Sequence, residues 1–139
     1  MIFGIDFETS HSYAGRDDCI ALPVVLQVGE ERVDFVASLD TGASHCLFQR
    51  SYAEALYLDV EGGLRKVFAT ATGRFEAYGH EVTISALDID VQSLVFFFAD
   101  AGILKNVLGR LGWLDRVKVG LVDHNQLLYV IRYDGFANS

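Results

Sequence analysis

The chain has 139 residues, of which 51% are hydrophobic and 12% aromatic, and its formal net charge is −8 at pH 7. This length and composition predict one globular domain with its own core and exclude a disordered chain. The negative charge argues against nucleic acid or an anionic membrane as the main partner. The longest apolar run, Leu94–Ala99, is far too short to span a bilayer.

Several residue types argue against other classes of site. The cysteines, Cys19 and Cys46, lack metal-ligand spacing, and the four histidines are scattered, so we expect free thiols and no metal. Residues 1–8 have no basic segment ahead of an apolar one, so we do not expect a secretory signal. Together these features predict a cytoplasmic protein without a cofactor.

The first third of the chain is organised around a hairpin. Residues 1–18 begin with apolar and polar residues in alternation and then turn polar, which suits either an extra edge strand or a mobile arm. Strands are predicted at Ile20–Val28 and Arg32–Leu39, joined by a short polar link. Because Pro23 has no backbone N–H, the first strand should lie at a sheet edge or begin there. In the second strand apolar residues recur with period two, and Asp40 follows at its end.

The remaining predicted elements are short and mostly extended. We expect strands at Leu47-Phe48, on both sides of a turn at Thr72-Gly73 within Val67–Ile84, and at Leu94–Phe98, Val107-Leu108, Lys118–Val122 and Gln126–Arg132, with brief helices at Arg50–Tyr57 and Leu111–Arg116. Eight to ten short strands and one or two helices predict a mainly β fold. The domain should cover residues 19–133, followed by a frayed tail at residues 134–139.

Asp40 is the first candidate functional residue. An ionisable carboxylate at the end of an apolar strand is unfavourable unless something solvates it. Thr41 offers a hydroxyl, and Gly42 lets the chain turn sharply and bring backbone N–H groups close to the carboxylate. The same tripeptide also suits a plain Asx turn at a strand end, so both interpretations stand at this point.

Three segments in a fixed order carry a resemblance to a known family. They are Leu39–Ser44 followed by Leu47-Phe48, then Ala69–Phe75, and then Asn106–Arg110 leading into Gly112–Arg116. They resemble the active-site loop, the flap, and the hydrophobic-hydrophobic-Gly element with its following helix in the single-domain, retropepsin-like aspartic proteases. The resemblance covers roughly residues 20–132. It implies an acid-protease-like, single-lobe barrel with one or two short helices that forms a two-fold homodimer.

The implied activity is that of an aspartic endopeptidase acting on a peptide or protein substrate. Such catalysis needs two carboxylates that share one proton and activate a water between them. The chain has only one Asp-Thr-Gly, so the resemblance implies that Asp40 from each of two protomers completes the site.

The resemblance also assigns supporting roles. Thr41 would bond across the dimer and Gly42 would offer backbone contacts to the substrate. The remaining assignments are Ala43 and Ser44 in the active-site loop, Ala71, Thr72 and Gly73 in the flap and substrate site, and Leu108, Gly109 and Arg110 in support of the loop. Arg110 would brace the loop through charge-assisted hydrogen bonds.

The chain departs from the retroviral pattern at Ser44, where those members carry an acidic residue, so Arg110 needs another partner. This departure keeps open a catalytically silent domain that uses the same fold for dimerisation or peptide binding. A domain cut from a larger protein is a further alternative. Next to the loop, we expect His45 to point to solvent and Cys46 to fill the core.

Overall fold

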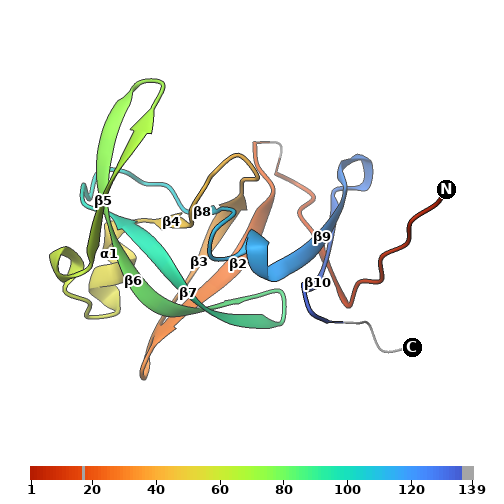
Figure 1. Cartoon of the computed structure of the whole chain (residues 1–139), viewed down its shortest axis with the longest axis horizontal. Helices are drawn as coiled ribbons and strands as arrows, with labels where there is room; N and C mark the ends of the chain where they lie inside the picture. The colour runs from red at the N-terminus through yellow and green to blue at the C-terminus, as the bar shows by residue number, and fades with distance from the viewer. Residues whose placement is uncertain (17, 136–139) are drawn as a thin grey trace.

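The computed structural model describes residues 1–16 and 18–135, and strands dominate it (Figure 1). The strands are β1 (Thr9–Ser12), β2 (Ala21–Val28), β3 (Glu31–Leu39), β4 (Leu47–Phe48), β5 (Leu64–Thr70), β6 (Gly73–Ala86), β7 (Ile89–Phe98), β8 (Val107–Leu108), β9 (Val117–Val122) and β10 (Leu127–Arg132). The described residues also contain one α-helix, α1 (Arg50–Ala55), and three 3-10 turns, η1 (Val60–Gly62), η2 (Leu114–Arg116) and η3 (Asp123–Asn125). The predicted mainly β class is confirmed.

The larger sheet closes on itself. Its strand order is β2-β3-β8-β4-β7-β6-β5, and β2 also pairs with β6 through Val25–Gln27, so six strands form a ring with β5 outside it. Side chains from several of these strands fill the interior and are fully buried, among them Leu22, Phe48, Ile84, Phe97 and Leu108. A second sheet, β1-β10-β9, lies beside the ring (Figure 1).

The β2–β3 hairpin forms where the sequence predicts it. Phe35 and Ala37 are buried and alternate with exposed neighbours along β3, because successive side chains of a strand point to opposite faces. Pro23 is exposed and precedes the segment Val25–Gln27 that pairs with β6, so its missing N–H interrupts no hydrogen bond to β6.

Two parallel pairings gather segments that are distant in the sequence. Strand β8 pairs with β3 through Leu39 and Leu108, and β4 pairs with β7 through Leu47 and Phe96. A single antiparallel pair, Leu47 with Val107, joins β4 to β8. The end of β3, where Asp40 follows, therefore lies at the centre of the sheet.

Two sequence expectations differ from the structure. The helix predicted for Leu111–Arg116 is reduced to the single turn η2, because Gly112 adopts a φ of +112° that a helix cannot contain. The buried strand predicted at Leu94–Phe98 is the end of a longer strand, β7, whose earlier residues are buried on one face only. Leu94 itself belongs to that one-sided part and is exposed.

The N-terminal segment carries the edge strand β1, which pairs with β10 from Thr9 opposite Val130 to Ser12 opposite Leu127. The Tyr13 hydroxyl donates a hydrogen bond to Asp123 Oδ1 at 2.5 Å. Burial and the neighbouring Asp123 carboxylate raise the pKa of Tyr13 to about 12. Residues 136–139 of the predicted frayed tail lie outside the described residues.

None of the helices in the described part of the chain has the length and apolar character needed to cross a membrane.

Candidate active site

Asp40 lies directly after β3 and is held by its main chain. Its N–H donates to the carbonyl oxygen of Leu108 at 3.0 Å, which extends the β3–β8 pairing by one residue. The Gly42 N–H donates to Asp40 Oδ1 at 2.9 Å, and the Ala43 N–H donates to the Asp40 carbonyl at 3.2 Å. This is an Asx turn, and it also presents the Asp40 carboxylate to solvent. The two interpretations of Asp40-Thr41-Gly42, a plain Asx turn and a carboxylate solvated by backbone N–H groups, are therefore both satisfied by this turn.

The segment after β8 lies directly under the Asp40 loop. The Arg110 N–H donates to the Ala43 carbonyl at 2.9 Å, and the Leu111 N–H donates to the Ser44 carbonyl at 2.8 Å. A Cβ atom on Gly109 would lie 2.2 Å from the His45 carbonyl oxygen and 2.8 Å from that of Ala43. Only glycine permits this approach of two backbone segments.

Arg110 contributes through its main chain rather than its side chain. The guanidinium is exposed and makes no hydrogen bond or ion pair within the part of the chain that the structure describes. The described residues of the single protomer therefore do not show the expected bracing by charge-assisted hydrogen bonds. Ser44, at the position of the departure from the retroviral pattern, instead has its Oγ 2.8 Å from His45 Nδ1.

His45 does not point to solvent as expected. Its ring packs edge-on against Phe68 at 5.3 Å and Phe96 at 5.2 Å between ring centroids. Burial lowers the pKa of His45, and the charge of Lys66 lowers it further. The ring thus connects the Asp40 loop to β5 and β7. Cys46 is fully buried in the core as expected, and burial raises the pKa of its thiol to about 12.

The predicted hairpin around Thr72 is present and projects from the ring. Strands β5 and β6 pair from Leu64 opposite Gly79 to Thr70 opposite Gly73, and they extend well beyond the barrel (Figure 1). The Thr70 hydroxyl donates to the Gly73 carbonyl at 2.9 Å across the turn. Phe68 and Phe75 stack with centroids 5.1 Å apart, and Phe75 contacts Phe98 of β7 at 5.2 Å. The hairpin is therefore fastened to the sheet by aromatic contacts near its middle.

A cleft of about 510 Å³ lies between the Asp40 loop and this hairpin. Three of the predicted site residues line it, namely Asp40, Ala43 and Thr72. The other predicted residues are not in its lining. They are Thr41, Gly42 and Ser44 in the loop, Ala71 and Gly73 at the hairpin turn, and Leu108, Gly109 and Arg110 beneath the loop.

Sequence reasoning missed most of the cleft wall. The additional lining residues are Leu47, Thr70, Phe75, Phe98, Ile103, Lys105 and Val107. Thr70 and Phe75 lie within the segment that resembles the flap, and Val107 lies two residues before Gly109 in the third segment of the resemblance. Ile103 and Lys105 lie in an irregular segment without periodicity. The only sequence signal for their place in the cleft was that this segment directly precedes the motif beginning at Asn106.

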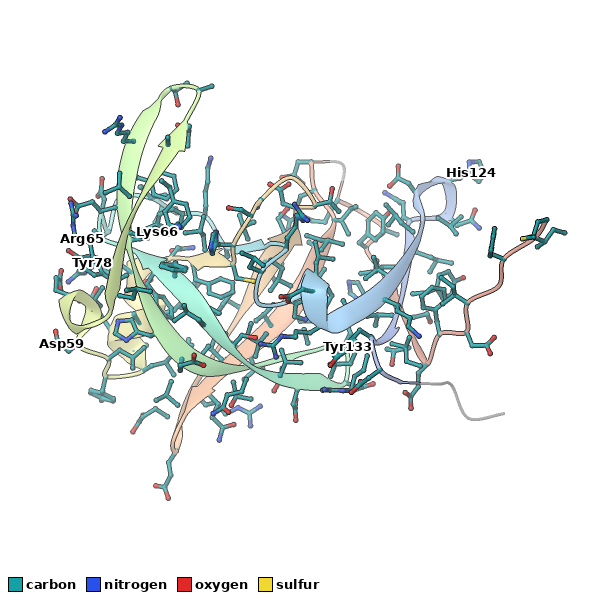
Figure 2. All side chains as sticks on the ribbon, in the orientation of Figure 1. Asp59, Arg65, Lys66, Tyr78, His124 and Tyr133 are labelled. Atoms are coloured by element: carbon teal, nitrogen blue, oxygen red, sulfur yellow. The ribbon has the colours of Figure 1, made fainter. Side chains whose placement is uncertain are left out.

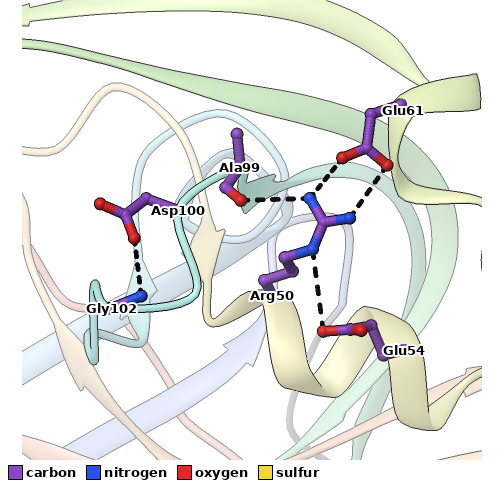
Figure 3. Close-up of polar contacts among 6 residues, drawn as sticks. All are labelled: Arg50, Glu54, Glu61, Ala99, Asp100 and Gly102. Atoms are coloured by element: carbon purple, nitrogen blue, oxygen red, sulfur yellow. Dashed lines mark hydrogen bonds and ion pairs between the residues drawn. The ribbon is translucent and has the colours of Figure 1, made fainter.

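This irregular segment has a defined path. It begins at the end of β7, where the Arg50 guanidinium donates to the Ala99 carbonyl at 3.1 Å while forming two hydrogen bonds with Glu61 (Figure 3). The Gly102 N–H then donates to Asp100 Oδ1 at 2.8 Å, also drawn in Figure 3. At its end, the Ser38 N–H donates to the Asn106 carbonyl at 2.9 Å. The segment is thus fixed at both ends.

The site is a solvated carboxylate beside a mainly apolar cleft that a hairpin overhangs. Asp40 is the only carboxylate among the described residues that lines the cleft. A lone carboxylate can accept or donate one proton, whereas the hydrolysis of an amide by carboxylates needs an acid and a base at once. No group of three or more His, Cys, Asp or Glu side chains within the described ranges could hold a metal ion.

A family model identifies the family of the chain, and solved structures share its fold. Residues 24–113 match the family model described as aspartyl protease. The fold is similar to a retropepsin-like aspartic protease from Rickettsia conorii, with a TM-score of 0.58 and 20% identity, covering 80% of this chain and 89% of that one. It is also similar to the EIAV protease in complex with the inhibitor HBY-793, with a TM-score of 0.53, 17% identity, and coverage of 69% and 86%. None of the curated sequences matches the chain.

Proposed function

Because the chain belongs to the aspartyl protease family, we propose that it is an aspartic endopeptidase that works as a two-fold homodimer. The observation that carries this proposal is the position of Asp40, which is exposed on a main-chain-braced turn and is the single carboxylate of its cleft in the described part of the chain. A second copy related by a two-fold axis would supply the other carboxylate.

In the proposed dimer the two Asp40 side chains share one proton and hold a water between them. The ionised carboxylate takes a proton from the attacking water, and the protonated one donates a hydrogen bond to the carbonyl oxygen of the scissile peptide bond. Two carboxylates at this distance cannot both ionise easily, so catalysis requires the singly protonated pair. Activity should therefore show a bell-shaped dependence on pH.

The neighbouring residues suit supporting roles in that dimer. Thr41 is exposed, and its hydroxyl has no hydrogen-bond partner within the described residues, so it is available to the loop of the second protomer. The β5–β6 hairpin, with Thr72 at its turn, is placed to fold over a bound peptide and exclude water. The substrate would be an extended peptide lying between hairpin and loop.

The test is the substitution Asp40→Asn, which keeps the size and the turn of the side chain but removes the carboxylate. The rate at which a peptide library is cleaved, measured by mass spectrometry at several pH values from acidic to neutral, should fall by about 10²–10⁴-fold. Asp34→Asn is the matched control, because Asp34 is exposed on β3, the strand that precedes Asp40, but outside the cleft. It should leave turnover unchanged.

Two results would count against the proposal. Cleavage by Asp40→Asn at the wild-type rate would show that another group does the chemistry. A folded wild-type dimer that cleaves no peptide at any pH would favour the alternative of a catalytically silent dimerisation or peptide-binding domain.

A further inference from the structure

Lys105 places a positive charge in the lining of a mainly apolar cleft. The lining contains two charged side chains among the described residues, Asp40 and Lys105, and no ion pair joins them. The apolar residues of the lining include Leu47, Phe75 and Phe98. The Lys105 ammonium is exposed and has no hydrogen bond or ion pair with any described residue. An unpaired cation at the rim of an apolar cleft is free to bind an anionic group of a ligand.

The main chain on both sides of Lys105 is held in place. Before it, the Ile103 N–H donates to the Asp100 carbonyl at 3.2 Å. After it, the side-chain oxygen of Asn106 accepts the Gln49 N–H at 3.1 Å, in addition to the bond between Ser38 and the Asn106 carbonyl. The Lys105 side chain therefore extends into the cleft lining from a segment that is hydrogen-bonded on both sides of it.

The hairpin above the cleft adds further positive charge. Arg65 and Lys66 lie at its base (Figure 2), and Arg74 lies next to its turn. Arg65 is neutralised by Glu76, with Nη2 2.6 Å from Oε1. Lys66 and Arg74 have no acidic partner within the described residues. Lys66 and Arg74 thus add positive charge on the hairpin to that of Lys105 in the cleft, in a chain whose net charge is −8, and this local charge favours an anionic ligand.

We propose that the cleft selects peptides that carry an acidic side chain close to a large apolar one, with Lys105 as the specificity-determining residue for the acidic position. This inference rests on the proposed endopeptidase function and names its substrate class. The apolar wall removes the large side chain from water. The Lys105 ammonium pairs with the carboxylate in a cleft where screening by water is weaker than on an open surface.

The experiment measures binding rather than turnover, so that it does not depend on catalysis. Fluorescently labelled peptides with a central Phe, and with Glu, Gln or Lys scanned through the flanking positions, are titrated into the Asp40→Asn protein by anisotropy. At one position the Glu peptide should bind about three- to tenfold tighter than the Gln peptide. The preference should weaken as the salt concentration rises.

Substitutions of Lys105 then test whether the preference for the Glu peptide depends on this residue. Lys105→Met should remove the difference between the Glu and Gln peptides, and Lys105→Glu should reverse it in favour of Lys. Arg32→Glu is the matched control, because it changes the net charge by the same amount at an exposed position of β3 outside the cleft. It should keep the Glu preference.

Equal binding of the Glu and Gln peptides at every position, or no binding of any peptide, would overturn the inference. So would an unchanged Glu preference in Lys105→Glu, since the selectivity would then belong to other cations. A Glu preference that follows Lys105, in a protein whose wild type cleaves nothing, would support the inference and reject the proposed chemistry. Failure of the proposed selectivity and failure of the proposed endopeptidase activity thus give different results.

Discussion

Gly109 is the residue on which the shape of the Asp40 loop most directly depends. Its missing side chain lets β8 and the segment after it pass within hydrogen-bonding distance of the loop, where Arg110 and Leu111 bind the carbonyl groups of Ala43 and Ser44. The space that a Cβ atom would need is occupied by two backbone carbonyl oxygens. Backbone atoms cannot move aside as the end of a flexible side chain can.

Substitution of Gly109 by alanine should therefore destabilise the protein by about 3 kcal/mol, because the added methyl group forces the loop and β8 apart. Urea denaturation, with the free energy of unfolding extrapolated to water, measures the change. Any variant that remains folded should also lose activity, because the Asp40 turn moves with the loop.

Gly4→Ala is the control for this experiment. A Cβ atom on Gly4 would meet nothing within 4 Å, so its free energy of unfolding should change by less than about 0.5 kcal/mol. Wild-type stability in Gly109→Ala would mean that the loop and β8 can separate without loss, contrary to the packing described above.

At the scale of single residues, the sequence predicted the residues whose roles follow from their immediate neighbours in the chain. Asp40 and Gly42 were identifiable because a turn and a carboxylate follow an alternating strand. Lys105 was not, because its importance comes from a cleft made by segments far apart in the chain. His45 was assigned to solvent, since nothing in the sequence indicates that Phe68 and Phe96 enclose its ring.

Among the elements, the β5–β6 hairpin has the most direct link to the proposed activity. It reaches beyond the ring, where the stacking of Phe68 on Phe75 joins its two strands and the contacts of Phe68 with Phe96 and of Phe75 with Phe98 hold it against β7. Aromatic pairs of this kind contribute about 0.5–1.5 kcal/mol each beyond their burial. The orientation of the hairpin over the cleft therefore depends on few side chains.

Phe75→Ala should loosen the hairpin while leaving the barrel folded. We expect faster hydrogen exchange at the amides of residues 67–78, little change in β7, and a fall in kcat/KM of about tenfold, because the hairpin no longer holds the substrate. Val67→Ala is the control, since Val67 is exposed and neighbours Phe68 on the other face of β5. Unchanged exchange in Phe75→Ala would show that the stack does not hold the hairpin.

Elements with local signals were predicted better than elements defined by partners. Both hairpins, β2–β3 and β5–β6, follow from alternating patterns on either side of a turn. Residues 1–18 left a strand and an arm equally open, because β1 exists through its pairing with the distant β10. The helix expected at Leu111–Arg116 was wrong beyond one turn, since helix-compatible composition does not reveal the positive φ of Gly112.

For the whole molecule, the proposed function requires two chains to make one site. Mixing the wild type with a ninefold excess of Asp40→Asn should lower its activity to about one tenth, because random pairing leaves few dimers with two Asp40 side chains. An equal excess of an unrelated folded protein should have no such effect. Sedimentation across a dilution series should show a species of twice the 15.4 kDa of one chain.

Retention of full activity in the mixture would place the complete catalytic site within one chain.

The family and the barrel could be predicted from the sequence because three motifs occur in the right order. The dimer is a prediction of a different kind, since it rests on the count of one Asp-Thr-Gly per chain and not on any contact within the chain.

The pairing of β3 with β8 has a consequence for the timing of synthesis. Asp40 leaves the ribosome first, and the carbonyl of Leu108 that binds its N–H and Gly109 beneath its loop follow almost seventy residues later. The edge strand β1 can pair only after β10 has also left the ribosome. Contacts of such wide sequence separation form late and slowly. A growing chain thus carries the Asp40 carboxylate before the β8 segment that supports its loop has been made.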